Sequence, residues 1–430
     1  MVSGNINKIG DMLVREGAHM FWWLHYTIAE TPNVTDRPLI LWLQGGPGSS
    51  STGYGNFEIL GPYDLNMEKR DFTWIKTHNV LFVDNPVGTG FSYVEHIKYL
   101  TKDNKQIAED LVELLRGFYE ALPEFKSVPL HIFGESYGGK MAIEFAHELY
   151  HEIENGNIES NLVTVAMGDA WISPIDSTLS WAPYLFQLGF VDEDGYERIN
   201  NYALRTKRAL DEGKYFQATD LWAQTEEVLL GYNMGVDFYN VLYDTRFSSS
   251  EDNAKQLFHH SPHSIAYDVM VKRKRINIGD ESDDEYTDPL TRMMRDEVHP
   301  ALGLSDDVKF GSQSSAVFDT LGGDFMKPVV SIVEHLLNNT SVKVVVYSGQ
   351  LDLICSTPGT VKWVNEMNWV GSKDYANAPR DGIGINNVLE GYVRKYGNFS
   401  MYWINKAGHM APFDNPRCMG YILRQVTNFG

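Results

Sequence analysis

The sequence predicts an α/β fold in which a mostly parallel central sheet carries helices on both faces. Short apolar runs of strand length alternate with stretches whose apolar residues recur at helical spacing, and this pattern is typical of βαβ units. Residues 174–323 depart from the alternation, because helical stretches dominate there and strand-like runs are few. We therefore expect a core built from residues 1–173 and 324–430, with an inserted helical cap between them.

The composition excludes several classes of protein. Hydrophobic residues make up 43% of the 430 positions and aromatic residues 13%, which supports a large packed core rather than a disordered chain. A formal net charge of −21 argues against binding to nucleic acid or to anionic lipid. No uncharged apolar run is long enough to span a bilayer, so we expect no membrane attachment.

The first part of the predicted sheet contains strands at residues 19–28, 38–43 and 79–84, each rich in apolar or aromatic residues. The second of these strands runs directly into the glycine-rich segment 44–50, and the third runs into a glycine-containing loop at residues 85–92. Glycine permits backbone conformations and close approaches that a side chain would block. Catalytic loops are expected at such positions, beyond the carboxyl ends of parallel strands.

A serine lies on a sharp turn later in the same part. An amphipathic helix is expected over residues 107–118, and the apolar run 130–133 predicts a buried strand that ends at Gly134. A helical pattern begins at Ala142, so Ser136 lies on the turn from strand to helix within a G-x-S-x-G motif. The motif alone also occurs by chance. With this context it predicts a nucleophile elbow, in which a strained turn exposes the hydroxyl and the next helix directs its N–H groups at a developing oxyanion.

The sheet continues with a predicted strand over residues 162–167, after which the insertion begins. Within the insertion, a helical stretch covers residues 214–230. A basic tetrapeptide at residues 272–275 is followed by an acidic run at residues 280–285. Such charge runs are typical of a mobile, solvated loop, and a protease-accessible processing site at the basic tetrapeptide is the alternative.

Two strands after the insertion, at residues 342–347 and 399–404, are each followed by a residue suited to catalysis. Asp352 and His409 would lie at the same edge of the sheet as Ser136, and the chain order Ser, Asp, His is that of α/β-hydrolases. His409 would take the proton of Ser136 and return it to the leaving group, while Asp352 would hold the imidazole tautomer. The sequence therefore predicts nucleophilic catalysis on an α/β-hydrolase fold.

Four stretches together resemble the serine carboxypeptidase family, and their order over nearly the whole chain makes the resemblance specific. They are residues 42–48 (WLQGGPG), 84–92 (DNPVGTGFS), 134–138 (GESYG) and 408–412 (GHMAP). Within the family, the retinoid-inducible branch is the most similar in three details. These are Gln44 in place of asparagine, YGGKM at residues 137–141 and GDAWIS at residues 168–173.

The resemblance implies an exopeptidase that removes residues from peptide or protein C-termini, prefers acid pH and uses no metal or cofactor. By motif position, it implies a catalytic triad of Ser136, Asp352 and His409. The backbone N–H groups of the oxyanion hole would be those of Gly46 and Tyr137. The substrate's terminal carboxylate would be held by Gln44, Gly45, Glu58 and Glu135.

Glu58 and Glu135 are expected to meet near that carboxylate. Two carboxyl groups forced together cannot both ionise cheaply, so one of them would keep its proton to higher pH than a free glutamic acid. The protonated group could then donate a hydrogen bond to the substrate, so binding of a free C-terminus should weaken as the pH rises.

The cysteines and the start of the chain bear on its location. The first residues carry no signal-peptide pattern, so the protein is either cytosolic or has lost its signal. The chain has two cysteines, Cys355 and Cys418, and Ser49 replaces a disulfide cysteine of many relatives. Cys355 matches a free thiol near the active site of carboxypeptidase Y. We expect it to serve here as a small buried apolar residue.

The cysteine count by itself favours the cytosol. Glycosylation sequons favour a secreted glycoprotein, and they begin at Asn33, Asn338, Asn339 and Asn398. The family resemblance implies a secreted or lysosomal protein. Two other functions stay open: an acyltransferase on the same scaffold, and a non-catalytic binding or protective protein.

Overall fold

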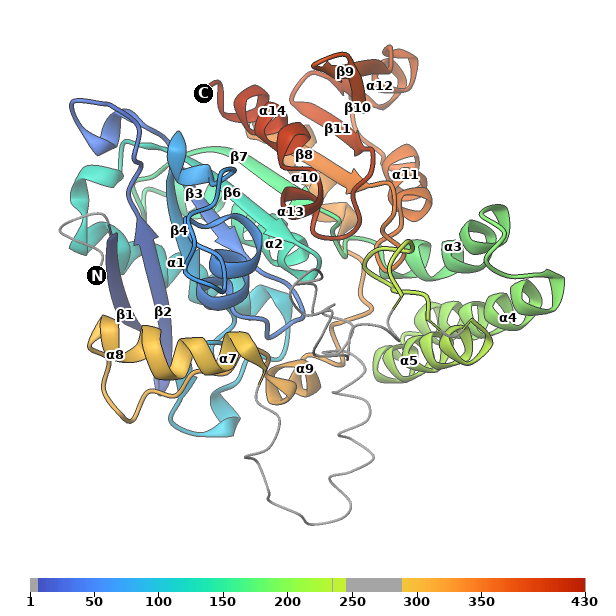
Figure 1. Cartoon of the computed structure of the whole chain (residues 1–430), viewed down its shortest axis with the longest axis horizontal. Helices are drawn as coiled ribbons and strands as arrows, with labels where there is room; N and C mark the ends of the chain where they lie inside the picture. Colours follow the sequence, from blue (N-terminus) through green and yellow to red (C-terminus); the bar gives the residue numbers. More distant parts are fainter. Residues whose placement is uncertain (1–6, 234, 245–287, 430) are drawn as a thin grey trace.

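The computed structural model describes residues 7–233, 235–244 and 288–429 (Figure 1). One mixed sheet of eleven strands runs through the molecule in the order β1-β2-β4-β3-β6-β7-β8-β11-β10-β9, with β5 paired to β2. The strands are β1 (Asn7–Arg15), β2 (Ala18–His25), β3 (Leu39–Leu43), β4 (Asn79–Val83), β5 (Tyr93–Val94), β6 (Pro129–Glu135), β7 (Asn161–Gly168), β8 (Lys343–Gly349), β9 (Asp381–Ile385), β10 (Val388–Tyr396) and β11 (Phe399–Ile404).

The centre of the sheet is parallel and both of its edges are antiparallel. All neighbours from β4 to β11 along the sheet order run parallel, whereas β1, β2 and β5 at one edge and β9 and β10 at the other pair antiparallel. The prediction of a mostly parallel sheet is therefore confirmed. The sequence did not reveal β1, β9 or β10, because these strands at or next to the sheet edges are partly exposed and lack a continuous apolar run.

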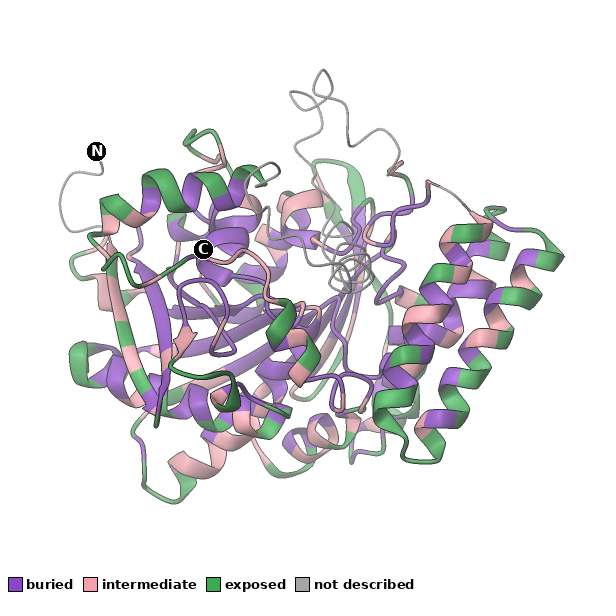
Figure 2. Cartoon of the chain, turned by 90° about the horizontal axis from the view of Figure 1, so that it is seen from below, coloured by how far each residue is buried: buried purple, intermediate pink, exposed green. Residues whose placement is uncertain are grey.

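Each face of the sheet has its own hydrophobic core. In β3, Leu39, Leu41 and Leu43 belong to one core, and Ile40 and Trp42 belong to the other, as strand alternation requires. The first core is covered mainly by α1 (Asn104–Ala121), α2 (Tyr137–Glu154), α10 (Val330–Asn339), α11 (Thr357–Glu366) and α12 (Ser372–Asn377). The second is covered by the π-helix η2 (Ser51–Leu60) and by α14 (Pro416–Thr427). Figure 2 shows the buried strands between these layers, with the exposed helix surfaces facing outward.

The nucleophile helix α2 begins five residues earlier than the apolar pattern predicts. It starts at Tyr137, whereas the apolar periodicity begins at Ala142. Before Ala142 only Tyr137 and Met141 add buried apolar side chains, because Gly138, Gly139 and Lys140 carry none, and this shortens the readable helical period. The first turn of α2 is instead specified by close backbone packing.

The described part of the insertion lies in two places. Helices α3 (Pro174–Gln187), α4 (Glu193–Asp211) and α5 (Tyr215–Tyr232) extend to one side of the sheet (Figure 1), and α3 packs against α11. In contrast, α7 (Pro289–Met293), η7 (Met294–Val298) and α8 (His299–Leu302) lie near β1 and β2, and α7 packs against η2. The assignment of residues 174–323 to an inserted helical cap stays a proposal. The charged runs at 272–275 and 280–285 lie outside the described residues.

Shorter elements complete the described chain. They are η1 (Val34–Asp36), η3 (Trp74–Lys76), η4 (Ile97–Tyr99), η5 (Pro123–Phe125), α9 (Ser315–Thr320) and α13 (Ala411–Asp414). Among the described helices, none combines the length and apolar character needed to cross a membrane.

Candidate active site

The residues assigned to catalysis follow strands that end at one edge of the sheet. The register pairs Leu43 of β3 with Gly134 of β6, and Gly349 of β8 with Ile404 of β11. The strands β7 and β8 connect these two pairs within the same parallel array. The loops after β3, β6, β8 and β11 are consequently brought to a common edge, although they are far apart in the sequence.

Ser136 occupies a strained turn between β6 and α2. Its φ of 62° and ψ of −129° place it in a region that residues with a side chain rarely adopt. A Cβ on Gly134 would lie 2.1 Å from the carbonyl oxygen of Gly138, and a Cβ on Gly138 would lie 2.2 Å from the carbonyl oxygen of Leu43. Both glycines of the motif are therefore required by close backbone contacts, as a nucleophile elbow demands.

His409 and Asp352 form a buried pair. The Nδ1 atom of His409 lies 2.9 Å from Oδ2 of Asp352, and the other carboxylate oxygen accepts a hydrogen bond from the backbone N–H of Cys355. An ionised carboxylate can only accept, so Nδ1 carries the proton and Nε2 is left as the base. Within the described chain, Nε2 of His409 has no hydrogen-bond partner, which leaves it available to a substrate-bound state of Ser136.

Burial keeps His409 neutral into the acid range. It lowers the pKa of His409 to about 4, against the opposing influence of the carboxylates of Glu135, Asp237 and Asp414. The ring of Tyr239 packs edge-on against the imidazole, with 4.9 Å between the ring centroids. The base is therefore shielded from water and stays unprotonated at mildly acid pH.

Asp169 is a second buried carboxyl beside Asp352, and the sequence analysis assigned it no role. It directly follows β7, and its Oδ1 accepts a 2.6 Å hydrogen bond from the N–H of Gly349. Burial, followed by the neighbouring Asp352 charge, raises the pKa of Asp169 well above its ordinary value. Burial also raises the pKa of Asp352, but Asp352 faces the N–H groups of Cys355 and His409. We therefore assign the proton of the pair to Asp169 and the negative charge to Asp352. For Asp169, the available sequence signal was its position immediately after the buried strand β7.

The glycine-rich loop after β3 lies directly against the nucleophile. A Cβ on Gly45 would lie 2.6 Å from the Cβ of Ser136 and 3.0 Å from the backbone nitrogen of Tyr137. The next residue, Gly46, has a φ of 109°, which favours glycine. The loop thus places Gly45 against the first residue of α2, and Gly46, the proposed second donor of the oxyanion hole, follows it directly in the chain.

Asp84, which the sequence motif 84–92 includes without a role, is hydrogen-bonded to this loop. Its carboxylate accepts hydrogen bonds from the hydroxyls of Ser50 and Thr52, each at 2.7 Å, and from the N–H of Phe91 at 2.9 Å. A Cβ on Gly90 would lie 2.1 Å from the same carboxylate. One buried acid therefore connects the two glycine-containing loops that follow β3 and β4.

Gln44 and Glu135 are joined in a buried chain of hydrogen bonds. The indole N–H of Trp42 donates to Oε1 of Gln44 at 3.0 Å, and Nε2 of Gln44 donates to Oε1 of Glu135 at 2.9 Å. The second oxygen of Glu135, Oε2, is buried without a partner among the described residues. Gln44 thus orients Glu135, whose free oxygen is the one able to meet a ligand.

Both glutamates assigned to the substrate carboxylate hold protons unusually tightly. Burial raises the pKa of Glu135 to about 8 and that of Glu58 to about 8. For Glu58, the charge of Asp288 raises the pKa further, and Arg70 lowers it. The expected retention of a proton is present, but burial of each carboxyl is its main cause rather than repulsion between the two. Tyr54 had no role assigned from the sequence; burial raises the pKa of its phenol well above the ordinary value, and the nearby carboxyls of Glu58 and Glu135 raise it further.

A buried ion pair lies behind the oxyanion residue. Nζ of Lys140 lies 2.8 Å from Oδ2 of Asp324, and the two side chains are 0% and 7% exposed. The same oxygen accepts a 3.0 Å hydrogen bond from the hydroxyl of Tyr137. Asp324 thereby joins the first turn of α2 to the chain that returns from the insertion.

We expect Asp324→Ala to lower the free energy of unfolding by about 3–5 kcal/mol, because the ammonium of Lys140 would stay buried without its partner. Denaturant unfolding followed by circular dichroism measures the change. A matched control is Asp211→Ala, which breaks an exposed Lys207–Asp211 pair and should cost less than about 1 kcal/mol. Equal effects of the two substitutions would contradict the assignment, whereas adding Lys140→Met to Asp324→Ala should restore stability.

Both cysteines are free and buried. Cys355 has no exposed surface, and burial raises the pKa of its thiol well above the ordinary value. These properties fit the reading of Cys355 as a small buried residue that supports Asp352 through its backbone N–H.

The chain matches known proteins over nearly its whole length. The serine carboxypeptidase family model matches residues 8–428. Retinoid-inducible serine carboxypeptidase from Rattus norvegicus is 40% identical over 96% of this chain and 90% of its own length, and that from Homo sapiens is 38% identical over the same shares. Serine carboxypeptidase-like 51 from Arabidopsis thaliana is 35% identical over 97% of this chain and 91% of its own length.

A solved structure agrees with the fold. Kex1(delta)p, a prohormone-processing carboxypeptidase from Saccharomyces cerevisiae, has a TM-score of 0.80 to this structure. The alignment covers 98% of this chain and 91% of the yeast chain at 21% identity, which supports the α/β-hydrolase fold. The family model and the sequence relatives show the family and the activity. The chain therefore belongs to the serine carboxypeptidase family and is a serine-type carboxypeptidase.

Proposed function

We propose that this carboxypeptidase removes C-terminal residues through an acyl-enzyme on Ser136 and works best at acid pH. The observation that supports the pH preference most directly is Glu135. This residue is adjacent to Ser136 in the chain, its pKa is raised to about 8, and its Oε2 is buried without a partner among the described residues. A protonated carboxyl at this place can donate to the terminal carboxylate of a peptide.

We assign the chemical steps to the proposed triad. Ser136 Oγ attacks the scissile carbonyl while Nε2 of His409 takes its proton, and Asp352 stabilises the imidazolium that forms. The N–H groups of Gly46 and Tyr137 stabilise the oxyanion. His409 then protonates the leaving amine, which departs as the C-terminal residue. Water then attacks the acyl-enzyme while His409 takes its proton. His409 returns this proton to Oγ of Ser136 as the acyl group leaves, which regenerates the enzyme.

The two ends of the working pH range have different causes. Below about pH 4, His409 becomes protonated and cannot act as the base, so turnover should fall. Above about pH 8, Glu58 and Glu135 lose their protons, and a free C-terminus then meets added negative charge. Binding of a free carboxylate should consequently be favoured below about pH 8.

We expect the Michaelis constant for a blocked dipeptide with a free C-terminus to rise above about pH 8, by up to tenfold per pH unit for each proton lost. The amidated dipeptide carries no terminal charge, so its Michaelis constant should stay nearly flat. Glu135→Gln supplies a permanently neutral donor and should reduce the slope for the free substrate. The measurement is the Michaelis constant against pH for both substrates, in the parent and in the variant.

The titration belongs to the pair of glutamates rather than to one of them, because both lie near the same ligand in this proposal. Parallel pH curves for the free and amidated substrates in the parent enzyme would overturn the proposed recognition of the carboxylate. An unchanged slope in Glu135→Gln would assign the titration to Glu58 alone. The acyltransferase alternative is tested by adding an alcohol acceptor, because a transferase would divert most of the acyl group to it.

We also propose a secreted or lysosomal location and glycosylation at Asn33, which endoglycosidase treatment of the native protein would test. Asn33 is exposed at the start of η1. In contrast, the amide of Asn398 donates hydrogen bonds to the carbonyls of Thr340 and Val342, which makes it a poor acceptor for a glycan. An acid working range supports the same location.

A further inference from the structure

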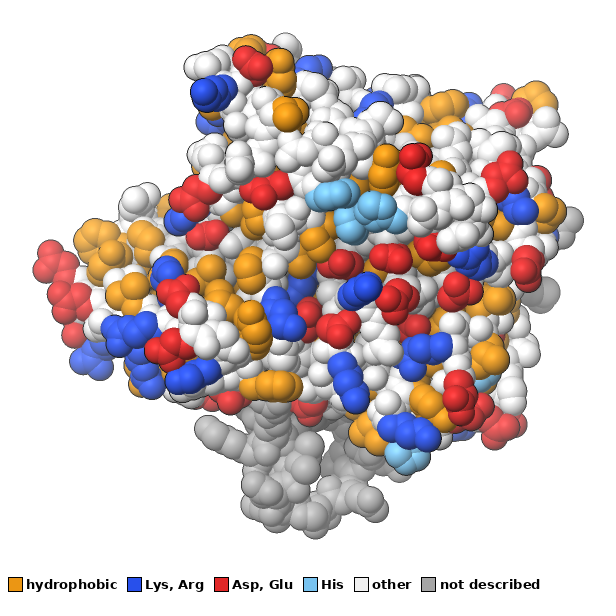
Figure 3. Space-filling view, turned by 180° about the vertical axis from the view of Figure 1, so that it is seen from behind, with side chains coloured by type: hydrophobic (Ala, Val, Ile, Leu, Met, Phe, Trp, Pro, Cys, Tyr) orange, Lys and Arg blue, Asp and Glu red, His pale blue; other side chains and the backbone are white. Residues whose placement is uncertain are grey.

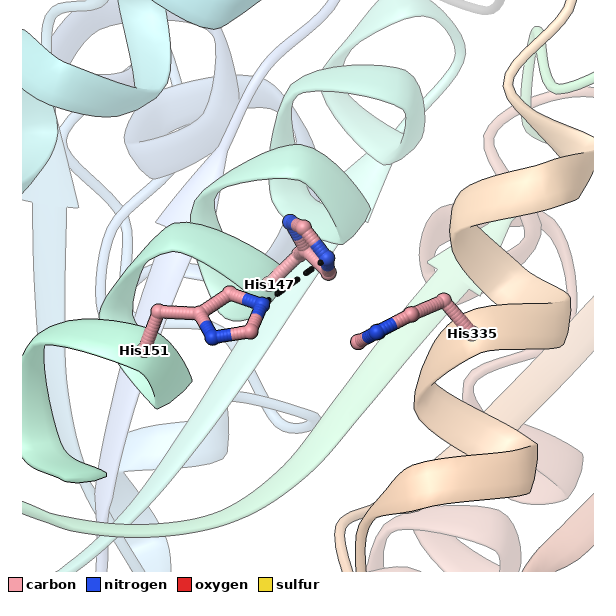
Figure 4. A group of neighbouring side chains, drawn as sticks. All are labelled: His147, His151 and His335. Carbon is pink, nitrogen blue, oxygen red and sulfur yellow. Dashed lines mark hydrogen bonds between the residues drawn. The ribbon is translucent and has the colours of Figure 1, made fainter.

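Three histidines meet on the surface of the core, away from the catalytic edge (Figure 4). His147 and His151 lie one turn apart on α2, and His335 faces them from the neighbouring helix α10. One ring nitrogen from each lies within 4.8 Å of the others. Nε2 of His147 is 3.2 Å from Nε2 of His151. Figure 3, which views the molecule from behind, shows histidine side chains gathered on this surface.

These distances fit a tetrahedral metal ion. Zinc–nitrogen bonds of about 2.0–2.1 Å place two ligand nitrogens roughly 3.3 Å apart in tetrahedral geometry. The pair on α2 already has nearly this spacing, and the ring centroid of His335 is 4.7 Å from that of His147 and 5.5 Å from that of His151. Small rotations of the rings are therefore enough to bring all three nitrogens onto one ion.

One ring nitrogen of the cluster has no other use among the described residues. Nδ1 of His335 is buried and has no hydrogen-bond partner within the described chain. Histidine binds a metal ion in its neutral form, through the lone pair of a ring nitrogen. Three neutral imidazoles without a carboxylate are donors for zinc and similar transition ions rather than for calcium or magnesium.

We propose that His147, His151 and His335 bind one divalent transition-metal ion, with zinc as the representative ion. All three residues are partly exposed, so the fourth position is open to water. The family resemblance implies no metal, and the spacing His147-x-x-x-His151 is the sequence signal for this proposed site.

The role of such an ion follows from the helices that it would join. Helix α2 begins beside Ser136, and α10 leads into β8, after which Asp352 follows. Eleven residues of helix separate Ser136 from His147, or about 16 Å at 1.5 Å per residue, so the ion cannot touch the reaction. It would instead stabilise the packing of α2, which follows Ser136, against α10, which precedes β8 and Asp352.

The test titrates the whole chelator-treated protein with zinc chloride and follows binding by calorimetry. The sequence has 13 histidines, so variants are needed to identify the site. His335→Ala and, separately, His147→Ala should each weaken the tightest site at least tenfold. His96→Ala is the matched control, because His96 is an exposed histidine outside the cluster, and it should bind zinc as the parent does.

Two further measurements make the result specific. Zinc should raise the melting temperature of the parent and of His96→Ala, but not that of His335→Ala or His147→Ala. Cobalt(II) bound to the parent should show the visible absorption bands of a tetrahedral ion, and the two cluster variants should lose them. Hydrolytic activity at saturating substrate should change little with zinc bound to this cluster.

A second set of potential ligands provides the competing outcome. Ligand atoms of Asp352, Cys355 and His409 also lie within 4.8 Å of one another. Zinc bound there would inhibit the enzyme, and Cys355→Ala would weaken that inhibition. Tight binding that survives in both cluster variants, or that disappears in Cys355→Ala, would overturn the proposed site.

Discussion

Replacing Ser136 with alanine should lower turnover by about a million-fold while leaving the fold intact, since members of such a triad act as one unit. Alanine accepts the backbone conformation of Ser136 no worse than serine does, because both carry a Cβ at a φ of 62°. The lost hydroxyl is therefore the only change at the site. Single-turnover kinetics with a blocked dipeptide measures the loss, and circular dichroism checks the fold.

A fluorophosphonate probe provides the control for this prediction. It should label the parent at Ser136 and fail to label Ser136→Ala. The variant should still bind a peptide with a free C-terminus, because Gln44 and Glu135 are unchanged. Activity well above background in Ser136→Ala would exclude Ser136 as the nucleophile, whereas a parent that resists the probe would favour a non-catalytic binding protein.

Two neighbouring buried acids should respond very differently to the same substitution. Asp352→Asn should lower turnover by about ten-thousand-fold, because an asparagine no longer selects the tautomer with the proton on Nδ1 of His409. Asp169→Asn should change turnover by less than about tenfold, because asparagine is neutral like the protonated acid that it replaces. A change of one unit in the pKa of His409 would correspond to that tenfold limit. The amide oxygen of the asparagine can still accept the hydrogen bond from the N–H of Gly349.

The comparison is made on kcat against pH for both variants, with the unfolding free energy as the check on folding. A large loss in Asp169→Asn with normal stability would show that Asp169 is ionised in the parent. In that case the proton of the pair would belong to Asp352, and the assignment of the triad acid would need revision.

The strand-to-helix alternation and the candidate catalytic residues were readable in the sequence because local constraints specify them. Buried parallel strands need continuous apolar runs, so β3, β4, β6, β7, β8 and β11 were all anticipated. The elbow needs glycines at fixed positions around Ser136, and the close contacts of Gly134 and Gly138 show why. Asp352 and His409 were proposed because they lie in the loops that follow β8 and β11.

Other features depend on residues that are distant in the sequence, and only the tertiary structure decides them. Edge strands such as β1 and β9 are partly exposed, so no apolar run marks them. The Lys140–Asp324 pair joins residues 184 positions apart, and nothing in the local sequence of either residue indicates its partner. The two halves of the described insertion also lie apart because α3 and α7 pack on different partners, α11 and η2.

Protonation is the clearest case of a property that tertiary structure alone decides. Glu135, Asp169 and Asp352 are all carboxyl groups, and nothing in their local sequence distinguishes an acid from a base. Burial raises the pKa of each, and the hydrogen-bond donors around Asp352 then favour a negative charge there rather than on Asp169. The sequence by itself determined which residues reach the catalytic edge, because strand ends and turns are local. Their protonation depends on desolvation and on neighbouring charges, which exist only once the chain has folded.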